Sequence, residues 1–300
     1  MIHYTNCPVC GSAEIAELFD VKDYTVSGKT FTILNCGRCS LRFTQDIPGT
    51  DEIGQYYKAD SYVSHTDTRK GLINQVYHRV RRHTLEGKRK MMEGAMGGKT
   101  GHVLDYGCGT GAFLSVMKKH GWEVTGAEPD SGARSIAQAQ YQILPLDPSS
   151  IGLLKDGYFD VITLWHVLEH VHDLHGTLAH LRRVLKKEGK IFIAVPNHNS
   201  VDAGHYGPAW AAWDVPRHLY HFSPESMQFL LKKSGFRQVD IRPMWFDSYY
   251  VSMLSEQYRK GSQNLLSAFW WGFQSNLAAG KDLKRCSSLI YVAEQNGYGT

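Results

Sequence analysis

The segment Val103-Leu-Asp-Tyr-Gly-Cys-Gly-Thr-Gly111 decides the fold of this chain. The residues from His102 to Tyr106 predict a buried strand, and Ala112 to His120, ended by Gly121, predict a helix. The turn between them carries three glycines. Glycine lets the backbone approach a ligand closely, and the first amides of a helix are free to bind it. We therefore expect a nucleotide-like ligand at this turn.

Two features separate this turn from the dinucleotide-binding pattern G-x-G-x-x-G. The third glycine comes one residue early, and Asp105 precedes the turn. A second predicted strand, Trp122 to Ala127, ends on Glu128, where a carboxylate can accept both hydroxyls of a ribose. Dinucleotide binding remains the weaker alternative.

Beyond His102, apolar strands alternate with helical stretches, which is typical of a mostly parallel α/β sheet covered on both faces. The glycine turn, Glu128, Tyr158-Phe-Asp-Val-Ile-Thr-Leu-Trp-His-Val-Leu-Glu-His170 and the segment Leu181 to Asn197 together resemble class I S-adenosylmethionine-dependent methyltransferases. The resemblance is to the small-molecule type, such as quinone-biosynthesis O-methyltransferases and sugar methyltransferases. It implies a Rossmann-like seven-stranded sheet whose last strand is antiparallel. It also implies that Leu181 to Asn197 forms a helix, a glycine stop and the fifth strand.

The same resemblance implies the cofactor site. In this family the acid of the first motif orients the methionine end of S-adenosylmethionine, and the acid after the second strand holds the ribose. Asp147 lies where an adenine contact is common. The expected cofactor-binding residues are Asp105, Gly107, Cys108, Gly109, Gly111, Glu128, Pro129, Asp147, Trp165 and His166.

Four histidines are candidates for the catalytic base. Methyl transfer from a sulfonium is an in-line displacement, so the enzyme positions the acceptor and removes its proton. A histidine, whose pKa lies near neutrality, suits this task. His166 and His170 follow the fourth predicted strand, and His218 and His221 follow the fifth. A structural side chain beside the cofactor is an equal alternative for His166. For the stretch Trp213 to His221, the alternative is an architectural loop held by an Asp214–Arg217 ion pair.

Four cysteines predict a metal site near the N-terminus. Cys7-Pro-Val-Cys10 and Cys36-Gly-Arg-Cys39 each aim two thiolates at one ion. Two such pairs make a closed tetrahedral set typical of a zinc ribbon, with no open position for chemistry, so the zinc would be structural. Short strands are expected at Ala13–Phe19 and Thr30–Leu34. Two redox pairs are the alternative.

The expected organisation is a zinc ribbon (1–45), a helical linker region (46–98) and a methyltransferase domain (99–300) with an aromatic insertion at about 246–285. In the linker region, Arg69 to Lys90 is rich in cations and carries apolar residues at helical spacing. It is either an RNA-facing strip or a helix with a solvated basic face. The insertion is expected to line an acceptor pocket or lid, to form a homodimer interface, or to be a helical pair.

Composition limits the function classes. The 42% of hydrophobic residues and the net charge of +4 indicate a globular protein without the basic excess of a dedicated nucleic-acid binder. No apolar run reaches the ~18 residues of a membrane span and the N-terminus has no signal pattern, so we expect a cytoplasmic protein without stable membrane insertion.

The leading hypothesis is methyl transfer to an oxygen or carbon of a small-molecule acceptor: a sugar, a phenol or quinol, or a lipid-like intermediate. An RNA guanine methyltransferase is the alternative, because a zinc ribbon also precedes this fold there. A non-catalytic cofactor-binding scaffold is a third.

Overall fold

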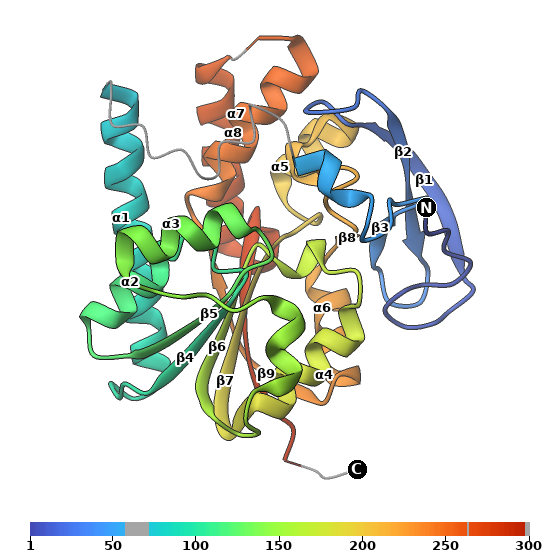
Figure 1. The fold of residues 1–300 in the computed structure, drawn as a ribbon. Coiled ribbons are helices and arrows are strands. Elements are labelled where there is room, and N and C mark those ends of the chain that lie inside the picture. Colours follow the sequence, from blue (N-terminus) through green and yellow to red (C-terminus); the bar gives the residue numbers. More distant parts are fainter. Residues whose placement is uncertain (58–71, 263, 298–300) are drawn as a thin grey trace. The chain divides into compact units, whose positions relative to one another are not determined.

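The computed structural model describes residues 1–57, 72–262 and 264–297 (Figure 1). Arg69 and Lys70 of the basic linker segment lie outside them. The chain forms two compact units. The first comprises Met1–Tyr62, His166–Ala179 and Phe192–Thr300, and the second comprises Val63–Trp165 and His180–Ile191. The two units are not separate stretches of sequence, because the chain passes between them more than once.

The second unit is the α/β part that the glycine turn predicted. Its complete elements are α1 (Leu72–Ala95), β4 (His102–Tyr106), α2 (Ala112–Lys119), β5 (Glu123–Ala127), α3 (Ser131–Tyr141), η2 (Pro148–Leu153) and β6 (Phe159–Trp165). Strand β4 pairs in parallel with β5 on one side and with β6 on the other. Val103, Leu104, Val161 and Ile162 are all fully buried, as expected for parallel strands covered on both faces.

The first unit contains most of the remaining elements. They are β1 (Ile15–Lys22), β2 (Thr30–Cys36), β3 (Arg42–Thr44), η1 (Ile53–Tyr57), η3 (Leu168–His170), α5 (Val201–Tyr206), η4 (Gly207–Ala209), η5 (Ala211–Trp213), β8 (Tyr220–His221), α6 (Pro224–Lys233), β9 (Phe236–Pro243), α7 (Asp247–Lys260), α8 (Leu265–Lys281), η6 (Leu283–Arg285) and β10 (Ser288–Gln295). Residues of α4 (Leu174–Val184) and β7 (Leu185–Pro196) fall in both units.

The larger sheet has the strand order β5-β4-β6-β7-β10-β9. Strands β9 and β10 pair antiparallel, which confirms the predicted antiparallel last strand. Seven strands were expected, and the described residues form six in this sheet. Beside β5 the structure has a single parallel bridge, Ala127 to Leu146, within Leu144-Pro145-Leu146. Because proline has no N–H to donate, this segment does not extend into a ladder.

The glycine stop predicted at Gly189 is wrong. Helix α4 already ends at Val184, and β7 runs from Leu185 through Gly189 to Pro196. A Cβ at Gly189 would lie 3.0 Å from the carbonyl oxygen of Asp160 and 2.7 Å from the Leu185 side chain. The glycine therefore permits close packing within the strand and does not end a helix.

The N-terminal strands form a second sheet with the order β1-β2-β3-β8. The predicted antiparallel strands are confirmed as β1 and β2. Strand β8 comes from far along the chain, and it pairs with β3 through Arg42–His221 and Phe43–Tyr220. Val21, Phe31 and Ile33 of this sheet share one hydrophobic core with Trp210 and Trp213. The cysteine-bearing segment is therefore built together with residues 203–221.

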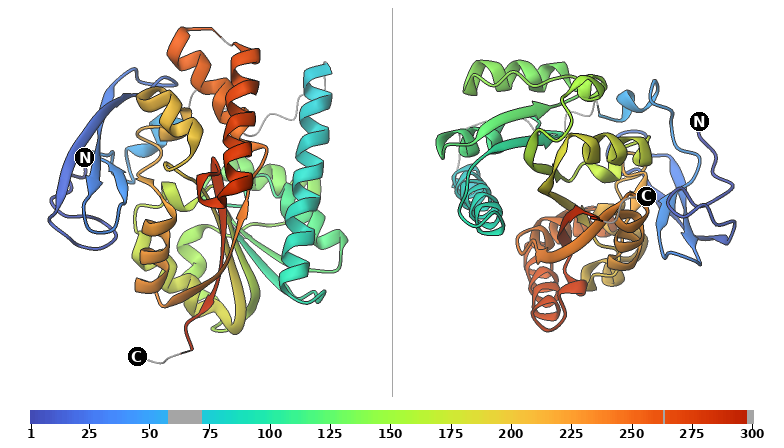
Figure 2. Two further views of the ribbon diagram at one scale, coloured as in Figure 1. Left: turned by 180° about the vertical axis from the view of Figure 1, so that it is seen from behind. Right: turned by 90° about the horizontal axis from the view of Figure 1, so that it is seen from below.

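The aromatic insertion is a helical pair. Helices α7 and α8 lie side by side and antiparallel (Figures 1 and 2). The buried residues of the pair include Ser248, Ser252 and Ser255 of α7 and Ala268 of α8. Among the described helices, none is long and apolar enough to cross a bilayer.

Candidate active site

The glycine turn of the second unit is held by the end of β5. Gly107, Gly109 and Gly111 have φ values of 77°, 53° and 76°, in the left-handed region that favours glycine. The amides of Gly107 and Cys108 both donate to the carbonyl oxygen of Ala127, at 2.7 and 3.1 Å. The turn therefore has a defined shape and leads directly into α2.

Glu128 is fixed beside this turn. It is 8% exposed, and its two carboxylate oxygens accept from the amides of Gly109 (2.8 Å) and Asp130 (3.0 Å). Arg134 donates to the carbonyl oxygens of Glu128 and Pro129 and lies 3.3 Å from Asp147 Oδ2. An oriented carboxylate next to a glycine turn matches the predicted ribose-binding acid.

Asp147 is more exposed than Glu128. Its Oδ1 accepts from the amide and the hydroxyl of Ser149, so it caps the 3-10 helix η2. These bonds, followed by the pairing with Arg134, hold the pKa of Asp147 below its ordinary value. The adenine contact of Asp147 stays a prediction.

Asp105 is a buried acid at the start of the turn. Burial raises its pKa to about 7, against the hydrogen bond that Thr163 Oγ1 donates at 2.6 Å. A cationic group brought close to Asp105 would favour its charged form. The amino and sulfonium groups of S-adenosylmethionine are such cations.

Trp165 is the last of the predicted cofactor-binding residues that belong to the second unit. Its ring packs edge-on against Phe113 at 5.4 Å, and Lys88 Nζ lies 4.1 Å from the ring centroid. Its buried Nε1 donates no hydrogen bond to the described chain. A buried donor of this kind normally has an acceptor, so Trp165 fits a site that a polar ligand completes.

His166 follows Trp165 directly and belongs to the first unit. It has a φ of 56°, which is uncommon for a residue with a side chain. Its Nδ1 lies 3.4 Å from Glu169 Oε1, and its Nε2 lies 3.0 Å from Asp247 Oδ2. Burial acts to lower the pKa of His166, but Asp247 and Glu169 outweigh it and raise the pKa to about 9. One third of the side chain is exposed.

The half-buried His170 and the buried His218 lie next to each other. The ring centroids are 4.6 Å apart, edge to face. His170 Nδ1 contacts Tyr57 Oη (3.0 Å) and the carbonyl oxygen of Arg217 (2.9 Å), and burial, with His218 nearby, lowers its pKa to about 4. His218 Nδ1 lies 2.8 Å from the carbonyl oxygen of Ala212, so that nitrogen carries the proton.

His221 lies in the small sheet, with its ring centroid 6.5 Å from that of His218. Its Nε2 contacts Thr44 Oγ1 at 3.1 Å, and its ring packs edge-on against Trp213. Burial holds its pKa well below the ordinary value. These contacts connect His221 to the β3–β8 pair.

Glu169 lies close to His166, His170 and His218. It is fully buried, and its ionised form is held by His166, which lowers its pKa against the effect of burial. One carboxylate oxygen and one ring nitrogen each from His170 and His218 lie within 4.8 Å of one another. Such a donor set can hold a divalent cation. The structure therefore brings His166, His170 and His218 together around one acid, and His221 lies beside His218 with its Nε2 against Thr44.

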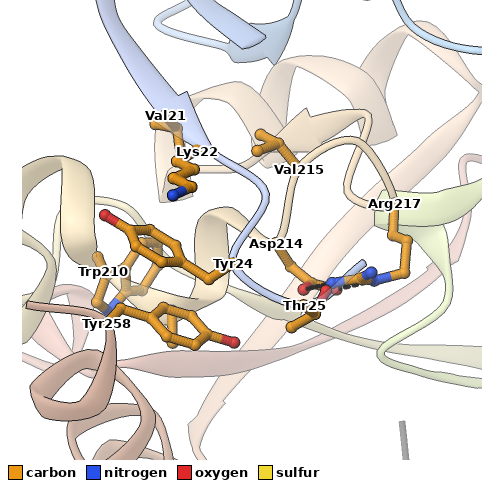
Figure 3. Close-up of a pocket in the computed structure, with 10 residues that line it drawn as sticks. Val21, Lys22, Tyr24, Thr25, Trp210, Asp214, Val215, Arg217 and Tyr258 are labelled. Carbon is orange, nitrogen blue, oxygen red and sulfur yellow. Dashed lines mark hydrogen bonds and ion pairs between the residues drawn. The ribbon is translucent and has the colours of Figure 1, made fainter. Parts of the chain in front are cut away.

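The loop that contains Arg217 is held by the contacts of its guanidinium (Figure 3). Arg217 is 1% exposed, and its guanidinium binds both carboxylate oxygens of Asp214 and the carbonyl oxygen of Tyr56. This confirms the predicted Asp214–Arg217 ion pair. Beside it, Tyr24 and Tyr258 stack with ring centroids 4.5 Å apart, on the wall of a small pocket.

Sequence reasoning missed Asp247 and Tyr57 as partners of the histidines. Both lie far from the His166–His170 motif in sequence, and neither stands in a recognisable pattern. Glu169 could have been found, because its spacing of three residues from His166 brings their side chains together within one turn.

The four cysteines of the N-terminal segment converge. Cys7 Sγ lies 3.6 Å from Cys39 Sγ, and Cys10 Sγ lies 3.5 Å from Cys36 Sγ. All four sulfurs lie within 4.8 Å of one another. Sulfurs bound tetrahedrally to zinc at about 2.3 Å stand about 3.8 Å apart. The set therefore has the size of a four-thiolate zinc site.

The fold and the site define a class of enzyme. The profile of the methyltransferase-domain family matches residues 77–241, more than half of the chain. The chain belongs to this family, and it is a methyltransferase of the S-adenosylmethionine-dependent class. Membership favours an enzyme over the non-catalytic scaffold.

Curated relatives and a solved structure agree with this assignment. The chain is 25% identical over 170 residues to the ubiquinone biosynthesis O-methyltransferase of Idiomarina loihiensis, covering 52% of this chain and 69% of the relative. It is 35% identical over 104 residues to the enzyme of that name from Coxiella burnetii, covering 33% of this chain and 44% of the relative. A candidate sarcosine dimethylglycine methyltransferase from Galdieria sulphuraria has a similar fold, with a TM-score of 0.50 and 16% identity over 71% of this chain and 86% of that one.

Proposed function

We propose that this protein transfers the methyl group of S-adenosylmethionine to a hydroxyl oxygen of a small-molecule acceptor, with His166 as the general base. The observation that carries the proposal is the placement of His166 between Glu169 and Asp247, directly after Trp165. The name of the two curated relatives supports an oxygen of a phenol or quinol as the acceptor group.

The second unit would hold the cofactor. Glu128 would accept from the ribose hydroxyls, Asp105 would face the cationic methionine end, and the glycine turn would allow close approach of the backbone. When bound, the cofactor supplies an electrophilic methyl group on a sulfonium. The residues of the chain then have two tasks: they orient the acceptor oxygen, and they take its proton.

Glu169 gives His166 the tautomer that a base needs. A carboxylate at Nδ1 favours the proton on that nitrogen, so the lone pair of the neutral ring lies on Nε2. Asp247 now contacts Nε2. An acceptor hydroxyl that takes the place of Asp247 would meet this lone pair. Removing Asp247 from the ring would also lower the pKa of His166, because one of its two anionic partners is lost.

His170 and His218 would position this pair. His218 is buried and His170 half-buried, and both lie close to Glu169 with their Nδ1 atoms bound to backbone carbonyl oxygens. We assign them the task of holding Glu169, and we assign His221 a structural role.

We further propose that Cys7, Cys10, Cys36 and Cys39 bind a structural Zn²⁺. The convergence of four sulfurs at the spacing of a tetrahedral site supports it. Four thiolates leave no position for water or acceptor, so this ion would contribute to folding and take no part in methyl transfer.

The proposal is tested by separating cofactor binding from methyl transfer. Calorimetry with S-adenosylmethionine measures the first, and radiolabelled methyl transfer to a panel of catechols and quinols measures the second. We expect His166→Asn to bind the cofactor like the wild type and to lose about 10²- to 10⁴-fold in kcat, the usual contribution of a general base.

The matched control is His120→Asn, an exposed histidine of the second unit, which should keep wild-type kcat. A folded His166→Asn variant with wild-type kcat would remove His166 as the base. Wild-type protein that binds no S-adenosylmethionine would contradict the proposal at its first step.

A further inference from the structure

Helix α8 buries small residues and exposes large apolar ones, which is the reverse of the usual surface helix. Its fully buried residues are all small: Ala268, Gly272, Ser275 and Ala279. A Cβ at Gly272 would lie 3.0 Å from Cα of Tyr249, so the backbones of α7 and α8 are in close contact there. Small residues on the packed face, spaced three or four positions apart, are typical of helix pairs in lipid.

Most large apolar side chains of α8 point outward, and the exception is Trp271, which stacks on His205 and packs against the core around Trp210. Six of them are exposed: Leu265 (62%), Leu266 (86%), Phe269 (64%), Trp270 (55%), Phe273 (41%) and Leu277 (44%). At 100° per residue, the six lie within an arc of about 140° on one side of the helix. We call them the α8 apolar face. A surface helix of a globular protein normally buries such a face.

The charges around this face are mostly positive. Between residues 257 and 285, the sequence has five cationic side chains, Arg259, Lys260, Lys281, Lys284 and Arg285, and all five are exposed. The single acid in this range is Asp282, whose side chain accepts from the amide of Lys284. Just before the range, the buried Glu256 pairs with Lys260 at 2.9 Å, which leaves Arg259 and the three cations at 281–285 without that partner. Cations thus stand at both ends of the α8 apolar face.

This charge pattern decides between two occupants. A second copy of the chain seated on the same face would bring the cations at its two ends against those of its partner, with little negative charge to offset them. An anionic lipid surface would attract both ends while the apolar residues enter the boundary of the acyl chains.

We propose that the α8 apolar face lies on the surface of a bilayer that contains anionic lipids. The helix would rest in the interface without crossing the bilayer, in agreement with the absence of a spanning helix among the described residues. Helix α7, packed against α8, begins at Asp247, the partner of His166. The proposal does not depend on the identity of the base or on methyl transfer, because binding to lipid is measured directly.

Sedimentation with vesicles tests it. The full-length protein should sediment with vesicles of phosphatidylcholine containing about one third phosphatidylglycerol, and much less with phosphatidylcholine alone or at high salt. The double variant Leu266→Ser/Phe269→Ser should bind at least about tenfold more weakly, because it removes two large apolar side chains that would enter the bilayer. Leu153→Ser is the control, since Leu153 is 88% exposed on η2 and should leave binding unchanged.

A second pair tests the charges. Lys281→Glu/Lys284→Glu should lower binding to the anionic vesicles at least about tenfold, whereas Lys118→Glu/Lys119→Glu on α2 should not. Wild-type fluorescence should shift to the blue on binding, and Trp270→Phe should reduce the shift. Absence of vesicle binding would overturn the proposal. So would wild-type dimers in analytical ultracentrifugation that Leu266→Ser/Phe269→Ser converts to monomers, because the face would then belong to a second copy.

Discussion

The side chains around Glu169 show how one buried acid sets the charge of its neighbours. His166 keeps its proton because two carboxylates contact its ring, and its pKa is raised to about 9. His170, also near Glu169, stays neutral because burial and the neighbouring His218 lower its pKa to about 4. Two histidines four residues apart therefore have opposite protonation states at neutral pH.

His198 gives a prediction about stability and pH. Its Nε2 contacts the carbonyl oxygen of Ser40 at 3.2 Å, and burial lowers its pKa to about 3. The unfolded chain, with an ordinary histidine pKa of about 6.5, binds the proton first as pH falls. The stabilising contribution of neutral His198 is thus full above pH 6.5 and decreases as pH falls toward 3.

We expect His198→Asn to be less stable than the wild type at pH 7.5, and the difference in free energy of unfolding to shrink by pH 4.5. Urea denaturation at several pH values measures it. Comparing the two proteins cancels the opposite contribution of Asp105, whose pKa is raised to about 7. A difference that stays constant from pH 7.5 to 4.5 would contradict the assignment.

At the scale of elements, the contact of α7 with α8 depends on Gly272. A methyl group there would meet Tyr249 at 2.7 Å on its ring and 3.0 Å on its backbone. We expect Gly272→Ala to destabilise the protein by about 1–3 kcal/mol, the usual cost of overpacking. Thermal unfolding followed by circular dichroism measures it.

Gly280 on the same helix is the matched control. It has nothing within 4 Å of an added Cβ. Gly280→Ala should be neutral or stabilise by up to about 1 kcal/mol, because alanine is the better helix former. Equal melting temperatures for Gly272→Ala and Gly280→Ala would contradict the prediction, because the added methyl group at residue 272 would then have no effect on the packing of α7 against α8.

The elements that sequence could predict are those with local signals. The strand, glycine turn and helix of β4 and α2 follow from apolar spacing and glycine within twenty residues, and the structure places them as expected. The two cysteine pairs were also predictable, because the two-residue spacing within each pair directs both sulfurs at one point. Strand β8 has two residues and no pattern, and its pairing with β3 depends on a contact between residues 42 and 221. Asp247 reaches His166 through a fold that no local pattern encodes.

For the molecule as a whole, the cysteine cluster predicts a dependence on metal. We expect a strong chelator to remove zinc and to lower the melting temperature, because binding of a structural ion is part of the folding free energy. The emission of Trp210 and Trp213 should change as well, since both belong to the core that the N-terminal sheet shares. Metal analysis and thermal unfolding measure the effect.

Two cysteine variants separate this effect from general destabilisation. Cys36→Ser should melt at a lower temperature than the wild type and should no longer respond to chelator. Cys286→Ser, at a buried cysteine outside the cluster, should still respond. Two results together would contradict the zinc site. The protein would contain no zinc after preparation with excess zinc, and its melting temperature would be the same with and without chelator.

The pairing of β3 with β8 has a consequence for protein engineering. A cut near residue 45 looks natural along the chain, yet it would leave Tyr220 and His221 as an open strand edge and expose Trp210 and Trp213. Such a truncated chain is a candidate for aggregation rather than a minimal catalytic domain. A chimera that exchanges the cysteine-bearing segment between relatives would have to transplant residues 203–221 with it.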